Sequence, residues 1–206
     1  MNCWALVPMK RRAEAKSRLA PVLALAPRLA LVRSMLAHVL GVLAAAPGAD
    51  RIAVVSPERD AVPDDILVLG EAGRGLNRAL GHAVATLHGL GARQVVIVPG
   101  DLPYLAPADV AALLTSLRAG GCALASDERG SGTNAIALDL ERLGPIAFRF
   151  LFGRNSFARH VRQARALGLS PQVVQRPGLS FDLDEPEALS AFMAAAGRTN
   201  ALREAS

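Results

Sequence analysis

Short apolar runs alternate with segments of helical periodicity along this 206-residue chain, and the alternation strongly constrains the fold. The runs are unbroken, as in Gln94–Val98 (QVVIV), which is typical of strands buried on both faces of a parallel sheet. Between two such runs, Leu29–Leu43 carries leucine and valine at spacings of three and four, which predicts an amphipathic helix. The pattern predicts an α/β domain with helices on both faces of a largely parallel sheet.

The other elements follow the same alternation, and proline or glycine marks most boundaries. We predict strands over Cys3–Val7, Arg51–Ser56, Ile66–Leu69, Gln94–Val98, Cys122–Ser126, Asn134–Leu138 and Gln172–Gln175. We predict helices over Leu29–Leu43, Leu76–Leu90, Val110–Leu117, Ser156–Leu167 and Pro186–Ala196, and Pro107 lies near the first turn of the third. We expect one domain over residues 1–197 and a frayed polar tail over residues 198–206.

Composition excludes several classes of protein. The chain is 51% hydrophobic and 20% charged, so it can bury a core and is not a disordered chain. The most apolar stretch, Val22–Ala46, is interrupted by Arg28, Arg33 and His38. We therefore predict no membrane span, and the basic residues that follow the first apolar run are the reverse of a signal peptide. We expect a cytoplasmic protein.

The cysteines and histidines show no spacing typical of a metal or nucleophile site. Cys3 and Cys122 lie far apart in strand-like segments, and we expect buried free thiols. No Ser-His-Asp or Cys-His arrangement is visible among the four histidines. We expect His160 to be a surface residue of its helix, with contact to an anion as the alternative. The sequence thus offers no evident general base.

The positive charge is concentrated in one segment. The chain has 23 Lys and Arg against 18 Asp and Glu, a net charge of +5 and a pI near 10.2. Nucleic-acid binding would explain this charge, but the chain has only six Phe, one Tyr and one Trp for base stacking. Seven arginines and no acidic residue lie between Glu141 and Asp182. Such a local concentration of positive charge suits an anionic ligand.

Three aspartates fall where α/β sheets bind ligands, beyond the carboxyl ends of strands. Asp101 directly follows the run Gln94–Val98, in the sequence PGDLP. Asp182 and Asp184 are two residues apart, so an extended segment places both on one side and Leu183 on the other, in the core. Three carboxylates predict a site for a divalent cation on a phosphate. The alternatives are a turn or helix cap at Asp101 and a helix N-cap at Asp184.

A basic segment and three glycine-containing loops offer further anion contacts. The basic segment follows the first strand, where such sheets hold phosphates, and includes Lys10, Lys16 and Arg18. The loop 70–77 (GEAGRGLN) lets backbone approach a flat ligand, and Asn77 has the hydrogen-bonding groups to bind a base edge. The loops 130–134 (GSGTN) and 152–157 (FGRNSF) offer N–H groups and hydroxyls. The alternatives are a solvated loop for the basic segment, a flexible connection for the loop 70–77, and a plain N-cap for Ser156.

Five motifs occur in a fixed order: Val7–Leu19, Gly100–Pro103, Gly130–Ala135, Phe152–His160 and Asp182–Pro186. Together they resemble the 2-phospho-L-lactate guanylyltransferase family (CofC/FbiD), enzymes of deazaflavin coenzyme F-420 biosynthesis. The resemblance spans residues 3–193. It implies a three-layer nucleotidyltransferase fold, glycosyltransferase-A-like and Rossmann-related, with a mixed, mostly parallel central sheet.

The resemblance also implies roles for individual residues. Mg²⁺ would be bound by Asp101, Asp182 and Asp184. The phosphorylated three-carbon acid would be held by Thr133, Gly153 and Ser156. The GTP triphosphate would face Lys16, supported by Lys10 and Arg18. Guanine would be recognised by the loop that contains Gly73, Gly75 and Asn77.

The implied reaction transfers GMP from GTP to the phosphate of 2-phospho-L-lactate, phosphoenolpyruvate or 3-phospho-D-glycerate, with release of pyrophosphate. A phosphate nucleophile is already ionised at neutral pH, so positioning and charge neutralisation suffice without a general base. The expected partners are these small molecules, with no nucleic acid and no membrane, and a homodimer is left open.

Three rival interpretations stay open at this stage. A nucleotidyltransferase of the molybdenum-cofactor type shares the implied fold, but usually carries a glycine-rich loop after the first strand, whereas Met9–Leu19 contains no glycine. A glycosyltransferase could use the D-x-D to hold a sugar nucleotide. A non-catalytic nucleic-acid-binding module would explain the charge, and salt-sensitive duplex binding would reveal it.

Overall fold

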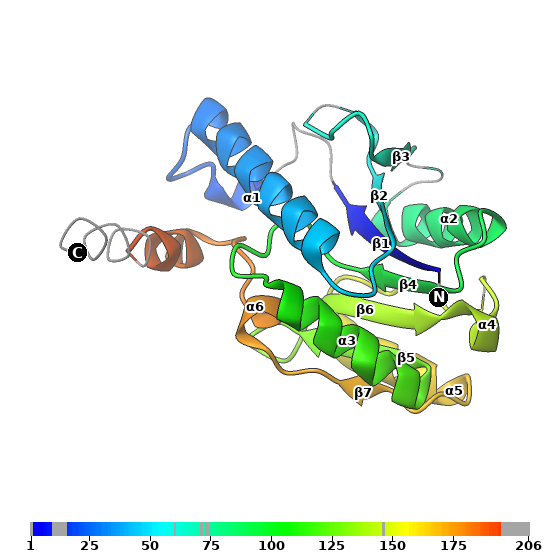
Figure 1. Cartoon of the computed structure of the whole chain (residues 1–206). Coiled ribbons are helices and arrows are strands. Elements are labelled where there is room, and N and C mark those ends of the chain that lie inside the picture. Colours follow the sequence, from blue (N-terminus) through cyan, green and yellow to red (C-terminus); the bar gives the residue numbers. More distant parts are fainter. Residues whose placement is uncertain are drawn as a thin grey trace, which may run out of the picture.

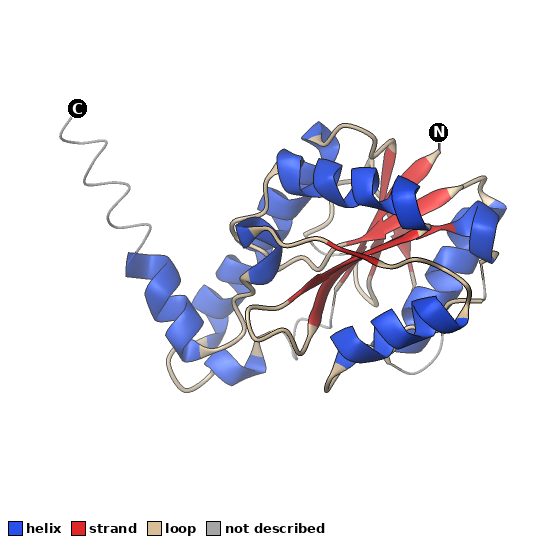
Figure 2. Ribbon diagram, turned by 90° about the horizontal axis from the view of Figure 1, so that it is seen from below, coloured by secondary structure: helices blue, strands red, loops and turns tan. Residues whose placement is uncertain are grey.

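A seven-stranded sheet with strand order β3-β2-β1-β4-β6-β5-β7 forms the centre of the computed structural model (Figures 1 and 2). The structure describes residues 2–9, 16–59, 61–70, 72, 75–145 and 147–194. The strands are β1 (Cys3–Pro8), β2 (Arg51–Val55), β3 (Leu67–Leu69), β4 (Gln94–Ile97), β5 (Cys122–Ser126), β6 (Thr133–Asp139) and β7 (Gln172–Val173). Only β6 runs against its neighbours β4 and β5, and the other pairs are parallel. The predicted mixed, mostly parallel sheet is confirmed.

Helices cover both faces of the sheet (Figure 1). They are α1 (Leu25–Ala45), α2 (Leu76–Gly89), α3 (Pro107–Gly120), α4 (Leu140–Leu143), α5 (Ser156–Ala166) and α6 (Pro177–Ser180), with a 3-10 turn η2 (Ser17–Leu19). Residues 186–194 form a further helix. The helices α1 and α3 contribute to the core on one face, and α2 and α5 contribute to the core on the other.

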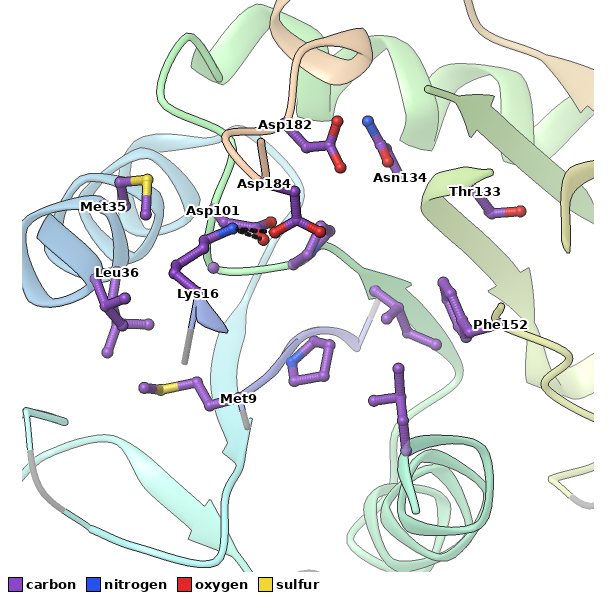
Figure 3. A pocket seen from close by; sticks show the side chains of 16 residues that line it. Met9, Lys16, Met35, Leu36, Asp101, Thr133, Asn134, Phe152, Asp182 and Asp184 are labelled. Carbon is purple, nitrogen blue, oxygen red and sulfur yellow. Dashed lines mark hydrogen bonds and ion pairs between the residues drawn. The ribbon is translucent and has the colours of Figure 1, made fainter. Parts of the chain in front are cut away.

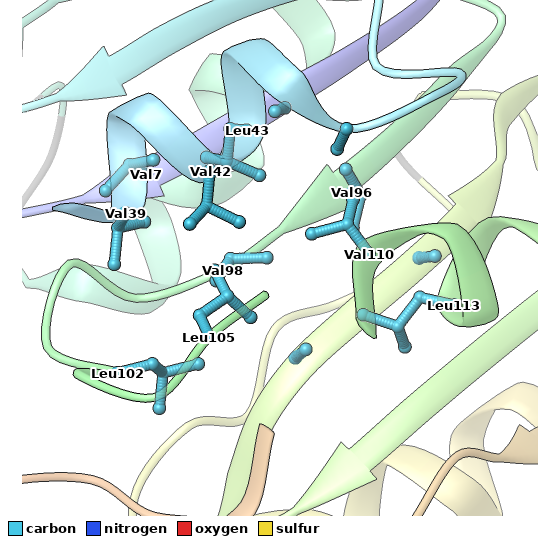
Figure 4. Packing of buried hydrophobic residues seen from close by; sticks show 14 of the residues in the cluster. Val7, Val39, Val42, Leu43, Val96, Val98, Leu102, Leu105, Val110 and Leu113 are labelled. Carbon is cyan, nitrogen blue, oxygen red and sulfur yellow. The ribbon is translucent and has the colours of Figure 1, made fainter. Parts of the chain in front are cut away.

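The central strand β1 shows why the apolar runs are unbroken. Cys3, Ala5 and Val7 belong to the core on the α1 and α3 face, part of which Figure 4 shows, whereas Trp4 and Leu6 belong to the opposite core. None of the five is more than 4% exposed. Because successive strand residues face opposite sides, a strand covered on both sides must be apolar throughout.

The helix α1 corrects one expectation. By length and composition alone it is long and apolar enough to cross a membrane, although the sequence was expected to contain no such stretch. Its buried residues include Leu36, Val39 and Leu43, which pack in the core of the α1 and α3 face. Packing on the sheet therefore accounts for much of the apolar character of this helix.

Most element boundaries differ from the predicted ones by a few residues. The helix α3 begins at Pro107, as expected from the proline near its first turn, and the Asp109 carboxylate accepts the Ala106 N–H at 2.9 Å and holds that turn. The helix α5 begins at Ser156 itself, with Asn155 as N-cap residue in the left-handed region (φ 54°). The alternative of Ser156 as N-cap is therefore wrong. The predicted tail lies outside the described residues.

Candidate active site

The strand directions gather the candidate residues at one edge of the sheet. The strand β1 ends at Pro8, and the parallel strand β4 ends shortly before Pro99 and Asp101. The antiparallel strand β6 begins at the same edge, with Thr133. These ends surround a pocket of about 230 Å³ (Figure 3). Its lining includes Lys16, Asp101, Thr133, Asn134, Phe152, Asp182 and Asp184. Sequence-distant motifs thus meet beyond the carboxyl ends of the strands, as expected for this sheet class.

The ammonium of Lys16 lies between two of the three aspartates. Its Nζ donates to Asp101 Oδ2 at 2.5 Å and to Asp184 Oδ1 at 2.6 Å (Figure 3). The side chain of Lys16 is only 6% exposed. Burial alone would lower the pKa of Lys16, but the charges of Asp101 and Asp184 outweigh it and raise the pKa above its ordinary value of 10.5. Lys16 therefore stays protonated and positively charged at physiological pH.

Asp182 lies beside this ion pair, and its pKa is raised by burial and by the other two aspartates. Burial, followed by repulsion from Asp101 and Asp184, raises its pKa from 3.8 to about 6, although Lys16 acts in the opposite direction. A pKa this high means that the positive charge near the carboxyl group does not balance the surrounding negative charge. A cation that binds beside Asp182 would relieve the repulsion.

The residues fit a divalent cation that is also bound by phosphate. Asp101 Oδ1 is buried, and no described residue donates a hydrogen bond to it. Within the described part of the chain, no three His, Cys, Asp or Glu side chains are arranged to hold a metal together. Mg²⁺ typically takes one or two carboxylates and completes its shell with water and substrate phosphate. The donor set therefore suits Mg²⁺ on a nucleotide better than a closed structural metal site.

Backbone and core contacts hold the D-x-D segment in place. Leu183 is fully buried, packed with Leu19 and Met35, so the prediction that it points into the core is confirmed. Its N–H donates to the Asp101 carbonyl at 3.4 Å. Upstream, the Asn134 amide donates to the carbonyls of Leu179 and Ser180 at 3.0 and 3.1 Å.

Asn134 was not singled out from the sequence, although it is a polar residue within an apolar strand. It is 6% exposed, and its two donor contacts link the start of β6 to the α6 segment. The Asn134 amide therefore fixes the segment that carries Asp182 and Asp184.

A second, larger pocket adjoins the first and shares Thr133, Asn134, Phe152, Asp182 and Asp184 with it. It has a volume of about 850 Å³, and Gly153 and Ser156 also line it. Among the described residues, the basic groups on its lining are Arg18, Arg129 and Arg154, and acidic groups such as Asp127, Glu128 and Glu187 line it as well. Glu185 lies 3.7 Å from Arg18 and 3.0 Å from Arg129. The residues expected to hold the phosphorylated acid thus border the pocket next to the aspartates.

His160 is a buried residue, and the expectation of a surface histidine is wrong. It is 0% exposed, because α5 turns it toward β6 and the 148–152 segment instead of solvent. Its Nδ1 lies 3.0 Å from Thr133 Oγ1, and its Nε2 accepts the Leu151 N–H at 2.8 Å. The sequence feature that could have indicated its burial is its position four residues after Ser156, which places both residues on the same side of the helix α5.

The Asn77 side chain is bonded to the protein backbone. Its Nδ2 donates to the Phe152 carbonyl at 3.1 Å, and its Oδ1 accepts the Phe152 N–H at 2.8 Å. An amide has a second donor and a second lone pair, so a base contact stays a prediction. Gly75 precedes α2 with φ 88°, a backbone that favours glycine. Lys10 and Gly73 lie outside the described residues.

Comparison with known proteins places these features in a family. The family model described as "Guanylyl transferase CofC like" matches residues 3–203. The chain belongs to the CofC guanylyl transferase family. It is 42% identical over 205 residues to the phosphoenolpyruvate guanylyltransferase of Rubrobacter xylanophilus, covering 96% of each chain. It is 41% identical to the 3-phospho-D-glycerate guanylyltransferase of Phenylobacterium zucineum, covering 89% of this chain and 86% of that one.

The fold of the CofC-family chain is also that of nucleotidyltransferases. A crystal structure of a putative nucleotide-diphospho-sugar transferase from Desulfovibrio desulfuricans G20 matches with a TM-score of 0.76 at 18% identity, over 90% of this chain and 84% of that one. The predicted family and fold class are therefore confirmed, and the protein is a nucleotidyltransferase. The individual roles of the site residues stay predictions.

Proposed function

We propose that this CofC-family protein transfers GMP from GTP to the phosphate of a phosphorylated three-carbon acid and releases pyrophosphate, as a step of coenzyme F-420 biosynthesis. The observation that carries the proposal is the gathering of Lys16 and three aspartates in a pocket that adjoins a second pocket at Thr133. Two joined pockets accommodate two anionic substrates whose reacting phosphates meet between them. The candidate acids are 2-phospho-L-lactate, phosphoenolpyruvate and 3-phospho-D-glycerate.

In this proposal the protein supplies position and positive charge. The phosphate of the acid is the nucleophile and is ionised at neutral pH, which agrees with the buried, bonded state of His160. Lys16, whose ammonium is held by Asp101 and Asp184, would turn toward the triphosphate and neutralise charge that develops on the leaving pyrophosphate. Arg18 and the loop containing Lys10 would support it.

Magnesium would be held by Asp101, Asp182 and Asp184 after Lys16 leaves the first and third of them, because the described structure does not have the three carboxylates arranged around a metal. Asp101 has a buried oxygen with no hydrogen-bond partner among the described residues, and Asp182 has a raised pKa of about 6. When bound, Mg²⁺ supplies charge neutralisation and orientation of phosphate oxygens. The carboxylates themselves fix the place where the two phosphates approach. Their rigid attachment through Leu183 and Asn134 keeps that place constant.

The acid would bind in the second pocket, at Thr133, Gly153 and Ser156. Gly153 has φ 120°, a backbone that side chains rarely adopt, and a Cβ there would meet open space. Backbone N–H groups near the start of α5 and the exposed Arg154 would face the anion. The guanine would lie toward the loop of Gly73, Gly75 and Asn77.

The test is pyrophosphate release by purified protein with GTP and Mg²⁺. We expect release only after one of the three acids is added, and a side-by-side comparison identifies the preferred acid. Absence of release with all three acids would contradict the proposal. A cytoplasmic location and a homodimer stay predictions, and light scattering on the purified protein tests the second.

A further inference from the structure

The ring of His160 is held by two hydrogen bonds and by aromatic neighbours. Thr133 Oγ1 lies 3.0 Å from its Nδ1, and the Leu151 N–H lies 2.8 Å from its Nε2. Phe148 stacks on the ring with centroids 5.8 Å apart, and Phe152 meets it edge-on at 5.0 Å. The ring therefore has one fixed orientation and no access to solvent.

These contacts determine which ring nitrogen carries the proton. The backbone N–H of Leu151 is always a donor, so Nε2 must accept and cannot be protonated. Burial, aided by the charge of Arg159, lowers the pKa of His160 from 6.5 to about 4, so the ring is neutral at physiological pH. A neutral imidazole with a bare Nε2 carries its proton on Nδ1. His160 therefore donates to Thr133 Oγ1.

The direction of this bond decides what the Thr133 hydroxyl does. Because its oxygen accepts from His160, its own proton is left to be donated elsewhere. Among the described residues, Thr133 Oγ1 has no hydrogen-bond partner other than His160. Thr133 lines both pockets and is 7% exposed. The Thr133 hydroxyl can therefore donate a hydrogen bond to a ligand in either pocket.

We propose that His160 is a positioning residue that commits the Thr133 hydroxyl to donate to an anionic oxygen of the acid substrate. The same ring fixes the Leu151 N–H, one residue before Phe152, and α5 carries Ser156 one turn earlier. One buried ring thereby connects the two loops expected to hold the acid. The proposal rests on the proposed function, since the acceptor is the phosphorylated acid.

The tautomer is testable without substrate or activity. In a ¹⁵N–¹H long-range correlation spectrum of ¹⁵N-histidine-labelled protein at pH 7, His160 should show a protonated Nδ1 and an unprotonated Nε2. The spectrum of a His160→Gln variant assigns the signal. The opposite tautomer or a doubly protonated ring would overturn the proposal, because Thr133 would then not be the acceptor as argued.

A pair of substitutions separates the two ring nitrogens. The amide of asparagine reaches the place of Nδ1, so His160→Asn can still donate to Thr133. The amide of glutamine reaches the place of Nε2, so His160→Gln retains only an acceptor for Leu151. We expect His160→Gln to raise KM for the acid about tenfold to a hundredfold, the loss of a hydrogen bond to an anion, with KM for GTP within about twofold. His160→Asn should raise KM for the acid severalfold less.

Two controls distinguish positioning from general damage. His88→Asn, at an exposed histidine near the end of α2, should leave both KM values unchanged. In a Thr133→Val background, His160→Gln should raise KM for the acid no further, because its effect acts through the hydroxyl. Equal effects of the Asn and Gln variants, or additive effects in the double variant, would contradict the proposal.

Failure of this proposal is distinguishable from failure of the proposed function. If no acid supports pyrophosphate release in the wild type, the proposed function fails, and with it the acid as acceptor. If release occurs and KM for the acid is insensitive to His160→Gln, only the role of His160 fails. If neither variant folds, the tautomer in the wild type still decides the direction of the bond.

Discussion

Asp182→Asn should stabilise the metal-free protein while it abolishes GMP transfer. Burial and the charges of Asp101 and Asp184 raise the pKa of Asp182 from 3.8 to about 6. Each pKa step of one corresponds to about 1.4 kcal/mol, so the ionised carboxylate opposes folding by at most about 3 kcal/mol. Because this side chain is only partly buried, we expect about 1–2 kcal/mol. The neutral amide has nearly the same shape and removes that repulsion.

The sign of the effect depends on pH. The pKa of Asp182 is higher in the folded than in the unfolded chain, so the folded state holds an extra proton between about pH 4 and 6. The free energy of unfolding of the wild type therefore falls as pH rises through this window. The advantage of Asp182→Asn should be full at pH 8 and absent at pH 4.

The measurement is thermal and urea unfolding in EDTA at several pH values. At pH 8 the melting temperature of Asp182→Asn should exceed that of the wild type by about 3–6 °C. The control Asp65→Asn removes an exposed carboxylate in the 64–66 loop region and should change it little. Saturating Mg²⁺ should stabilise the wild type more than the variant. A variant that is less stable than the wild type at pH 8 in EDTA would refute the reasoning.

Three further changes test the site and its support. Lys16→Met should lower kcat/KM by about 10²-fold or more. It should also strengthen Mg²⁺ binding without GTP, because the ammonium no longer occupies Asp101 and Asp184. Calorimetry measures this binding, and weaker binding than in the wild type would contradict the expectation. Asn134→Leu should lower the free energy of unfolding by about 2–3 kcal/mol in urea and reduce activity, since two carbonyls lose their donor; full activity would argue against its role. Gly178→Ala should destabilise by about 1–3 kcal/mol, because a Cβ would overlap the Asp109 carboxylate; Gly81→Ala, where a Cβ meets open space, should not.

The sheet was predictable because a strand that is buried on both faces needs apolar residues at every position, which leaves an unbroken apolar run in the sequence. The unbroken apolar runs Gln94–Val98 and Cys3–Val7 predicted buried strands, and Pro99-Gly100 places Asp101 beyond the end of the strand β4. The spacing of Asp182 and Asp184 likewise fixed the burial of Leu183. These are local properties of extended chain and need no knowledge of partners.

The supporting contacts were not predictable because they join residues far apart in the chain. Asn77 bonds to Phe152, 75 positions away, and no local pattern distinguishes that use from contact with a base. His160 lies on a helix with many polar residues, and its burial follows only from how α5 packs against the sheet. The ion pair of Lys16 with Asp101 and Asp184 similarly spans most of the chain.

The most direct test of the central claim is a pyrophosphate-release assay with GTP, Mg²⁺ and each of the three phosphorylated acids. We expect release that requires the acid, a product in which GMP is joined to the phosphate of that acid, and loss of both with Asp182→Asn. Release of pyrophosphate without any acid, or no release with 2-phospho-L-lactate, phosphoenolpyruvate and 3-phospho-D-glycerate alike, would contradict guanylyl transfer to such an acid.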